Sequence, residues 1–190
     1  MDVGAAFSVK RPAVIAIVGA ESTGKSVLAQ ELAQHLREHH GIRCAAVDEW
    51  LRTWCVREGR TPRSEEQAAI AQVQSQRIQA AAMQYDVVVA DTTALMTAVY
   101  SEWLFQDRSL RAAAQAQHSR YALTLVTAND LPWQADGLQR DGPQMREPVR
   151  HLILQMLQEA AVDHGEVSGS GSARLVNALS LVKSRMGLAE

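Results

Sequence analysis

Residues 13–26 read AVIAIVGAESTGKS, and this stretch decides the fold. Its first six residues are all apolar, which is typical of a strand buried on both faces in the middle of a parallel sheet. The next eight residues satisfy the phosphate-binding pattern GxxxxGK(S/T). Glycines in this pattern let the backbone wrap so that N–H groups face phosphate oxygens, and the helix that starts there adds the positive end of its dipole. The sequence therefore predicts a nucleotide phosphate site between a buried strand and a helix.

The residues of this loop have distinct expected roles. Lys25 is expected to reach the β- and γ-phosphates of ATP, and the Ser26 hydroxyl is expected to ligate Mg²⁺. The required helix is expected directly after the loop, because leucines at four-residue spacing form one apolar stripe. Gly41 is expected to end this helix. The expected nucleotide-binding residues of the loop are Gly19, Glu21, Ser22, Thr23, Gly24, Lys25 and Ser26.

Strand and helix patterns alternate along the rest of the chain. Strands are expected at 43–47, 85–90, 122–126 and, weakly, 166–168. A capping box formed by Ser64 and Gln67 is expected to open a long Ala/Gln-rich helix. This alternation favours an α/β fold of the P-loop NTPase class, with a parallel five-stranded sheet and helices on both faces. We expect one domain over residues 1–190, with a polar, Pro- and Gly-containing lid segment at about 129–148.

Composition limits the classes of protein to consider. The 190 residues carry a formal net charge of −2, which argues against a nucleic-acid-binding surface. No apolar run is long enough to span a membrane, and residues 1–11 show no secretion signal. The two cysteines, Cys44 and Cys55, fit a reducing compartment and lack metal-ligand spacing. These features favour a cytoplasmic protein that binds neither nucleic acid nor membrane, and they leave open whether it forms a homo-oligomer.

Acidic residues end two of the expected strands, at the edge of the sheet where ligands gather. Asp91 ends the third strand, where its carboxylate can hold Mg²⁺ directly or through water, or can instead cap the next helix. Asp48 and Glu49 end the second strand, where one of them can accept the proton of an attacking hydroxyl, or both can be solvated. The sequence does not decide which of the two is the base.

Aromatic residues accompany these carboxylates. Trp50 follows Glu49 directly and Trp54 lies four residues further on, and such a ring can stack on a planar ligand or simply pack in the core. Trp103 and Phe105 are expected to pack in the core of a helix, with no functional role.

Several segments together resemble the ribosylnicotinamide kinase domain of NadR-type proteins, among the P-loop kinases and AAA-like ATPases. The loop GAESTGKS, the segment Glu49-Trp50-Leu51-Arg52 and the stretch Ala90-Asp91-Thr92-Thr93 are similar to that family's phosphate loop, its E-Y-A-R segment and its Walker B region. Residues 129–146 resemble its lid, and Ser168-Gly169-Ser170 with Arg174 resembles its closing loop near the adenine. The resemblance spans roughly residues 13–183.

This resemblance implies ATP-dependent phosphorylation of the 5′-hydroxyl of nicotinamide riboside, with ATP and Mg²⁺ as cofactors. The catalytic residues it implies are Lys25, Glu49 or Asp48, Asp91, and the lid cations Arg140 and Arg146. It adds Gly169 and Arg174 to the nucleotide-binding residues, and it implies acceptor contacts from Glu49, Trp50, Arg52, Trp133 and Asp136. The implied metal ligands are Ser26 and Asp91. The two lid arginines can also belong to a solvated charged loop.

Other functions are compatible with the same residues. Trp50 stands where the family usually has tyrosine, so the acceptor can differ and can be another nucleoside or a small alcohol. A nucleotide-binding regulatory ATPase without a small-molecule acceptor is a further alternative, because fold does not fix function. Such a switch needs neither the lid nor a carboxylate after the second strand, and an NKxD guanine motif is lacking. The chain also has no HxGH nucleotidyltransferase motif, so only the kinase module is indicated.

Overall fold

The structure is a computed structural model that describes residues 12–135 and 142–187, and its centre is a five-stranded sheet. All strand pairs are parallel, and the strand order is β2-β3-β1-β4-β5. The strands are β1 (Ala13–Val18), β2 (Cys44–Val47), β3 (Val87–Asp91), β4 (Leu123–Thr127) and β5 (Gly165–Val167). The predicted fold class is confirmed.

Helices follow most of the strands. They are α1 (Lys25–His40), α2 (Trp50–Glu58), α3 (Gln67–Ala82), α4 (Ala94–Phe105), α5 (Arg111–His118), α6 (Arg146–Glu159) and α7 (Ser172–Met186). Two short 3₁₀ segments, η1 (Ser64–Glu66) and η2 (Pro143–Met145), precede α3 and α6.

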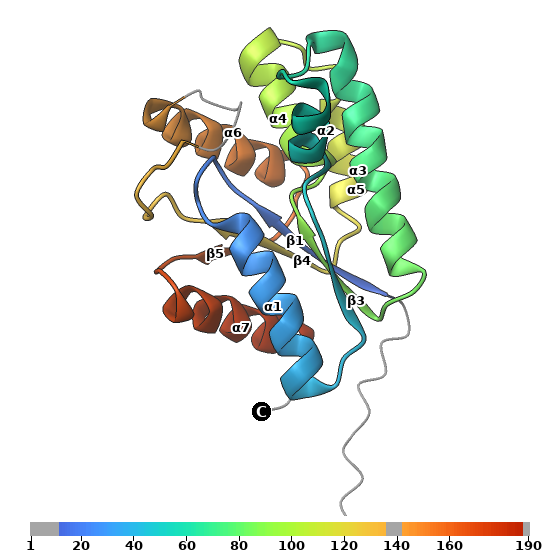
Figure 1. The fold of residues 1–190 in the computed structure, drawn as a ribbon, viewed down its shortest axis with the longest axis vertical. Helices are drawn as coiled ribbons and strands as arrows, with labels where there is room; N and C mark the ends of the chain where they lie inside the picture. The colour runs from blue at the N-terminus through green and yellow to red at the C-terminus, as the bar shows by residue number, and fades with distance from the viewer. Residues whose placement is uncertain (1–11, 136–141, 188–190) are drawn as a thin grey trace, which may run out of the picture.

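Helices cover both faces of the sheet (Figure 1). Because neighbouring residues of a strand point to opposite faces, the central strand β1 contributes to both cores. Ile15 and Ile17 pack with α1 and α7, whereas Val14 and Val18 pack on the other face with α3, α4 and α6. Burial of each such side chain contributes about 1.5–3 kcal/mol. This two-sided burial explains why residues 13–18 are apolar without interruption, and it holds the loop after β1 on a rigid support.

The first helix follows the sequence prediction closely. Leu28, Leu32 and Leu36 are almost completely buried against the sheet. Gly41 adopts the left-handed conformation with φ of 61°, and its N–H donates to the Leu36 carbonyl, so the helix ends there.

The capping box predicted for Ser64 and Gln67 is wrong. Instead, the Glu66 carboxylate accepts a hydrogen bond from the Arg63 N–H at 2.8 Å and pairs with Arg60 at 2.6 Å. The hydrogen bonds from Arg60 and from the Arg63 backbone lower the pKa of Glu66 to about 2. Gln67 is buried, because the 3₁₀ turn η1 moves the start of the α-helix one turn onward.

A buried histidine lies beneath the start of α4. His118 is 1% exposed, and its ring nitrogens bond to the hydroxyls of Thr93 (3.1 Å) and Thr124 (2.9 Å). Thr93 in turn caps α4 by accepting a hydrogen bond from Leu95 N–H. Burial lowers the pKa of His118 to about 4, so the ring stays neutral in the folded protein at neutral pH.

We therefore expect His118 to make folding stability depend on pH. In the unfolded chain the imidazole takes up a proton below its ordinary pKa of about 6.5, whereas the folded protein resists protonation until about pH 4. The free energy of unfolding therefore decreases as the pH falls from 6.5 towards 4, and protonation of this histidine accounts for roughly 3 kcal/mol of the decrease. Urea unfolding at pH 7, 5.5 and 4 should show a flatter profile for His118→Gln than for the original chain.

The matched control is His151→Gln, because His151 is exposed on α6. This variant should keep the pH profile of the original chain. If His118→Gln lost stability with pH as steeply as the original chain, another group would carry the effect.

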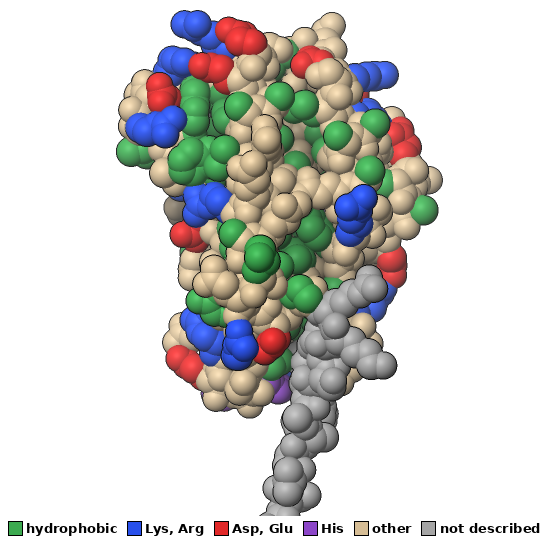
Figure 2. Space-filling model, turned by 90° about the vertical axis from the view of Figure 1, so that its right-hand side faces the viewer, with side chains coloured by type: hydrophobic (Ala, Val, Ile, Leu, Met, Phe, Trp, Pro, Cys, Tyr) green, Lys and Arg blue, Asp and Glu red, His purple; other side chains and the backbone are tan. Residues whose placement is uncertain are grey.

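Charged side chains of both signs are interspersed on the face that Figure 2 shows, rather than gathered into one field. Among residues 12–135 and 142–187, no helix is both long and apolar enough to cross a membrane.

Candidate active site

The phosphate loop lies at the carboxyl end of the central strand, between β1 and α1 (Figure 1). Gly24 precedes the helix with φ of 75°, a left-handed conformation that favours glycine. The first N–H groups of a helix have no partner within it, so the start of α1 offers donors to an anion. The conformation therefore agrees with the phosphate-binding role predicted for this loop.

A threonine at the end of β4 contacts the phosphate loop. Thr127 contacts Thr23 hydroxyl to hydroxyl at 2.7 Å, and Thr23 donates to the Ala20 carbonyl at 2.8 Å. Both threonines are fully buried. A Cβ at Gly19 would overlap the Thr127 hydroxyl, so only glycine fits there. Strand β4 thus fixes the path of the phosphate loop.

Lys25, Ser26 and Asp91 meet beside this loop. The Lys25 ammonium donates to the Ala20 carbonyl at 2.7 Å, so its charge lies over the loop itself. Asp91 is 2% exposed, and burial raises the pKa of its carboxyl even though a hydrogen bond from Ser26 and the charge of Lys25 act to lower it. The Asp91 Oδ1 atom is buried without a hydrogen-bond partner among the described residues.

These groups fit a hard divalent cation. Mg²⁺ prefers oxygen ligands and usually takes one or two carboxylates or hydroxyls together with phosphate oxygens and water. The unsatisfied Asp91 oxygen and the Ser26 hydroxyl supply that donor set. Within the described part of the chain there is no group of three or more His, Cys, Asp or Glu residues that could hold a metal ion.

The alternative role of Asp91 as a helix cap does not apply, because Thr93 caps α4. Thr92, between them, has φ of 65°, which is unusual for a β-branched residue. Such local strain is typical of sites where function fixes the backbone.

A small cavity of about 40 Å³ adjoins the phosphate loop on the side of β2 and β3. Glu49 lines it and its side chain is 15% exposed, 3.8 Å from the guanidinium of Arg52. Asp48 lies outside the lining, and its carboxylate accepts a hydrogen bond from Gln30 at 2.6 Å. The residues that line the cavity are Glu21, Ser22, Lys25, Glu49, Arg52, Thr92, Met96, Tyr100 and Gln134.

Trp50 does not line this cavity. Its ring packs beside Trp54, with the guanidinium groups of Arg57 and Arg77 at 5.7 and 5.4 Å from its centroid. Its backbone N–H donates to Gln74 at 2.8 Å. Tyr100 is the aromatic residue in the cavity lining instead.

The first part of the predicted lid lies over the phosphate loop. Gln134 N–H donates to the Ser22 hydroxyl at 2.8 Å, and Leu131 packs against Gly24. A cavity of about 480 Å³ lies between residues 131–135, residues 22–27 and Arg52. This volume suits a nucleotide-sized ligand.

The residues predicted for the lid differ in where they lie relative to the two cavities. Arg146 is 7% exposed, and it donates to the Leu131 carbonyl at 2.8 Å while its Nε and Nη2 atoms have no hydrogen-bond partner among the described residues. Trp133 is part of the segment 131–135, but it lies outside the lining of both cavities. Arg140 and Asp136 lie outside the described residues.

The predicted closing loop is tied to the phosphate loop rather than to either cavity. Arg174 is buried at 4% exposure and donates to the carbonyls of Thr23 and Gly169 and to Asp130. Gly169 N–H donates to Asp130 at 2.6 Å. Neither Gly169 nor Arg174 lines the two cavities described above.

Comparison with known proteins agrees with this geometry. A family model described as AAA domain matches residues 14–174. The chain belongs to the AAA domain family. No curated protein matches the sequence.

Solved structures show the same fold for this AAA domain. A NadR protein in complex with NR gives a TM-score of 0.77 at 18% identity, over 96% of this chain and 52% of that one. A NadR protein with NAD and AMP-PNP gives 0.73 at 17% identity, over the same shares. Thymidylate kinase from Ehrlichia chaffeensis gives 0.64 at 15% identity, over 92% of this chain and 98% of that one. The chain therefore has a P-loop kinase fold and spans about half the length of the NadR chains.

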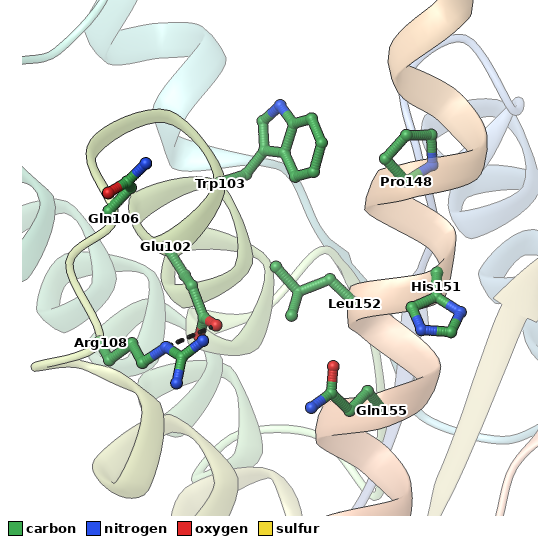
Figure 3. A pocket seen from close by; sticks show the side chains of 8 residues that line it. All are labelled: Glu102, Trp103, Gln106, Arg108, Pro148, His151, Leu152 and Gln155. Carbon is green, nitrogen blue, oxygen red and sulfur yellow. Dashed lines mark ion pairs between the residues drawn. The ribbon is translucent and has the colours of Figure 1, made fainter.

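A larger groove of about 740 Å³ lies away from the phosphate loop of the AAA domain. Figure 3 shows Glu102 and Trp103 on α4 facing Pro148 and Leu152 on α6, with Glu102 paired to Arg108. The expectation that Trp103 and Phe105 are core residues is wrong, because they are 38% and 37% exposed. They lie at the last turn of α4, and Trp103 lines this open groove.

Three residues of the site were missed from the sequence. Thr127 and Tyr100 carry a weak signal, since one ends a strand and the other lies one helical turn after Met96. Gln74 carries none, because it is one of many glutamines in α3. In the structure it accepts from Trp50 N–H and donates to the Thr92 carbonyl at 3.3 Å, which joins α2 to the end of β3.

Proposed function

We propose that the protein is an ATP-dependent small-molecule kinase that phosphorylates the 5′-hydroxyl of nicotinamide riboside to give nicotinamide mononucleotide. One observation carries the proposal. A phosphate loop with Lys25, Ser26 and the partly unsatisfied Asp91 lies directly beside a cavity that contains the Glu49 carboxylate. Phosphoryl transfer to a hydroxyl needs these two elements side by side.

Each residue has a task in this reaction. The loop N–H groups and Lys25 bind the triphosphate and neutralise its charge. Ser26 and Asp91 would hold Mg²⁺, which when bound neutralises charge on the β- and γ-phosphates. Glu49 orients the acceptor hydroxyl and takes its proton as the oxygen attacks phosphorus. The segment 131–135 excludes water from the phosphates, which limits hydrolysis.

Two of the solved structures support this choice of acceptor. NR and AMP-PNP occupy the NadR proteins to which this chain is similar over 96% of its length. Tyr100 places an aromatic residue in the lining of the cavity, and cation–π attraction would favour a pyridinium ring there. Trp50 is less suited to that role, because two arginines already flank its ring.

A panel of acceptors tests the proposal. ADP release from ATP should rise strongly with nicotinamide riboside and little with thymidine, uridine or adenosine. A stronger response to another nucleoside would change the acceptor but keep the kinase. Stoichiometric nucleotide binding without any acceptor-stimulated turnover would indicate a regulatory ATPase instead.

The two carboxylates after β2 should differ in their importance. We expect Glu49→Gln to lower kcat by about a hundredfold or more with little change in nucleotide affinity, as for loss of a general base. Asp48→Asn should keep most of the turnover, because Asp48 bonds to Gln30 outside the cavity lining. Steady-state kinetics with ATP and nicotinamide riboside measure both.

Glu58→Gln is the matched control, since Glu58 is exposed at the C-terminal end of α2, the helix that begins directly after Glu49. It should leave kcat within about twofold of the original value. A larger loss from Asp48→Asn than from Glu49→Gln would transfer the role of base to Asp48.

A further inference from the structure

Arg174 joins three loops at the edge of the sheet where the phosphate loop lies. Its Nη2 atom donates to the carbonyls of Thr23 (2.8 Å) and Ala128 (3.1 Å). Its Nη1 atom donates to Asp130 at 2.9 Å and to the Gly169 carbonyl. The side chain is 4% exposed, and the two contacts of its Nη2 atom are shielded from water. A guanidinium is suited to such a task, because its planar fork donates in fixed directions.

The contact with Thr23 has a consequence for the next N–H group. In a trans peptide the carbonyl and the N–H of the same unit point in opposite directions, and no cis peptide is present among the described residues. Arg174 holds the Thr23 carbonyl on its own side. The Gly24 N–H, which belongs to the same peptide, must therefore point away from Arg174.

This peptide borders the proposed phosphate site, whose lining does not include Arg174. Thr23, Gly24, Lys25 and Ser26 line the 480 Å³ cavity under the lid segment. Gly24 is also the cap residue of α1, so its N–H belongs to the donors that a helix leaves unpaired for an anion.

Asp130 balances the charge of Arg174. The partial burial of Asp130 acts to raise the pKa of its carboxyl, but hydrogen bonds from Gly169 N–H and Arg174 outweigh it, and the net pKa is lowered. Because the cation has an anionic partner, its value to the phosphate loop lies in holding the peptide and not in added positive charge.

We propose that Arg174 is a positioning residue, which orients the Thr23–Gly24 peptide so that the Gly24 N–H faces the nucleotide phosphates. The inference rests on the proposed nucleotide binding. It differs from the adenine contact that the sequence resemblance implied for Arg174, because it acts on the phosphates alone.

Two ligands separate these roles. Titration calorimetry should compare Mg·AMP-PNP with magnesium tripolyphosphate, which has the phosphates but no base. Arg174→Met should lower the affinity for both by the same factor of about ten or more, as for loss of a charged hydrogen bond. Arg174→Lys, which keeps a cation, should show a smaller loss that is again equal for the two ligands, and it serves if Arg174→Met does not fold. In glycine-labelled protein, tripolyphosphate should shift the Gly24 amide resonance far less in either variant than in the original chain.

Asp130→Asn is the matched control, because it removes the charge partner and leaves intact the Arg174 Nη2 atom, which contacts Thr23 and Ala128. It should lower Tm while keeping tripolyphosphate affinity within about twofold. Three results would overturn the inference: a loss restricted to AMP-PNP, no loss for either ligand, or an equal loss in Asp130→Asn. If the original chain bound neither ligand, the proposed kinase function would be contradicted as well. This result differs from the three above, in which the original chain binds both ligands and only the role of Arg174 is contradicted.

Discussion

Replacing Lys25 by Met should abolish phosphoryl transfer while leaving the fold intact. The Lys25 ammonium lies over the phosphate loop, where it donates to the Ala20 carbonyl at 2.7 Å. When a nucleotide binds, a short movement of this side chain would bring its charge to the phosphates. Stabilisation of the charge on a transferring phosphoryl group is worth about a thousandfold or more in rate. We expect a loss of that order in kcat/KM, measured by ADP release with a saturating acceptor.

The control for this variant is Lys183→Met, in the last turn of α7. It removes the same charge from another helix and should keep kcat/KM within about twofold. Circular dichroism should give the same spectrum for both variants. Turnover retained by Lys25→Met would remove the phosphate loop from the mechanism.

Replacing Asp91 by Asn should also abolish turnover, but it should stabilise the protein. The carboxylate is buried with one oxygen unpaired, and burial raises its pKa. A raised carboxyl pKa means that the ionised group opposes folding, so stability falls as the pH rises through the folded-state value. Asn keeps the shape and can still accept a hydrogen bond from Ser26, but it removes the buried charge.

Two measurements therefore move in opposite directions for Asp91→Asn. At pH 7 without Mg²⁺, Tm should rise, whereas kcat with Mg·ATP should fall by about a hundredfold or more because the carboxylate no longer supports the metal. Asp86→Asn, just before the start of the same strand, should change neither. If Tm fell with Asp91→Asn, the carboxylate would stabilise the fold and would not be held for a ligand.

The sequence was sufficient for the architecture because local patterns and burial agree. Residues 13–18 form a strand buried on both faces, and the leucines of residues 28–36 form the buried stripe of α1, as their spacing predicts. The error at Ser64 and Gln67 has a local cause, since the pattern does not reveal a 3₁₀ turn whose capping box begins one residue earlier, with Arg63 as the cap and Glu66 at the third position. The error at Trp103 arises because helical spacing does not show that a groove stays open between α4 and α6, and Trp103 lines that groove.

The site was only partly predictable. Lys25, Ser26 and Asp91 could be placed because a motif and a strand end fix their positions relative to the sheet. Glu49 and Asp48 could not be separated, since the choice depends on the direction in which each side chain leaves the loop after β2. Arg174 was found by resemblance, but its contact with Thr23 links positions 151 residues apart, which no local pattern reports.

The most direct test of the account is transfer of the γ-phosphoryl group of ATP to nicotinamide riboside by the purified chain with Mg²⁺. Mass spectrometry should detect nicotinamide mononucleotide, with one ADP formed for each molecule of product, and Lys25→Met should form none. ATP consumption that is absent, or that proceeds at the same rate with and without any nucleoside, would contradict the account.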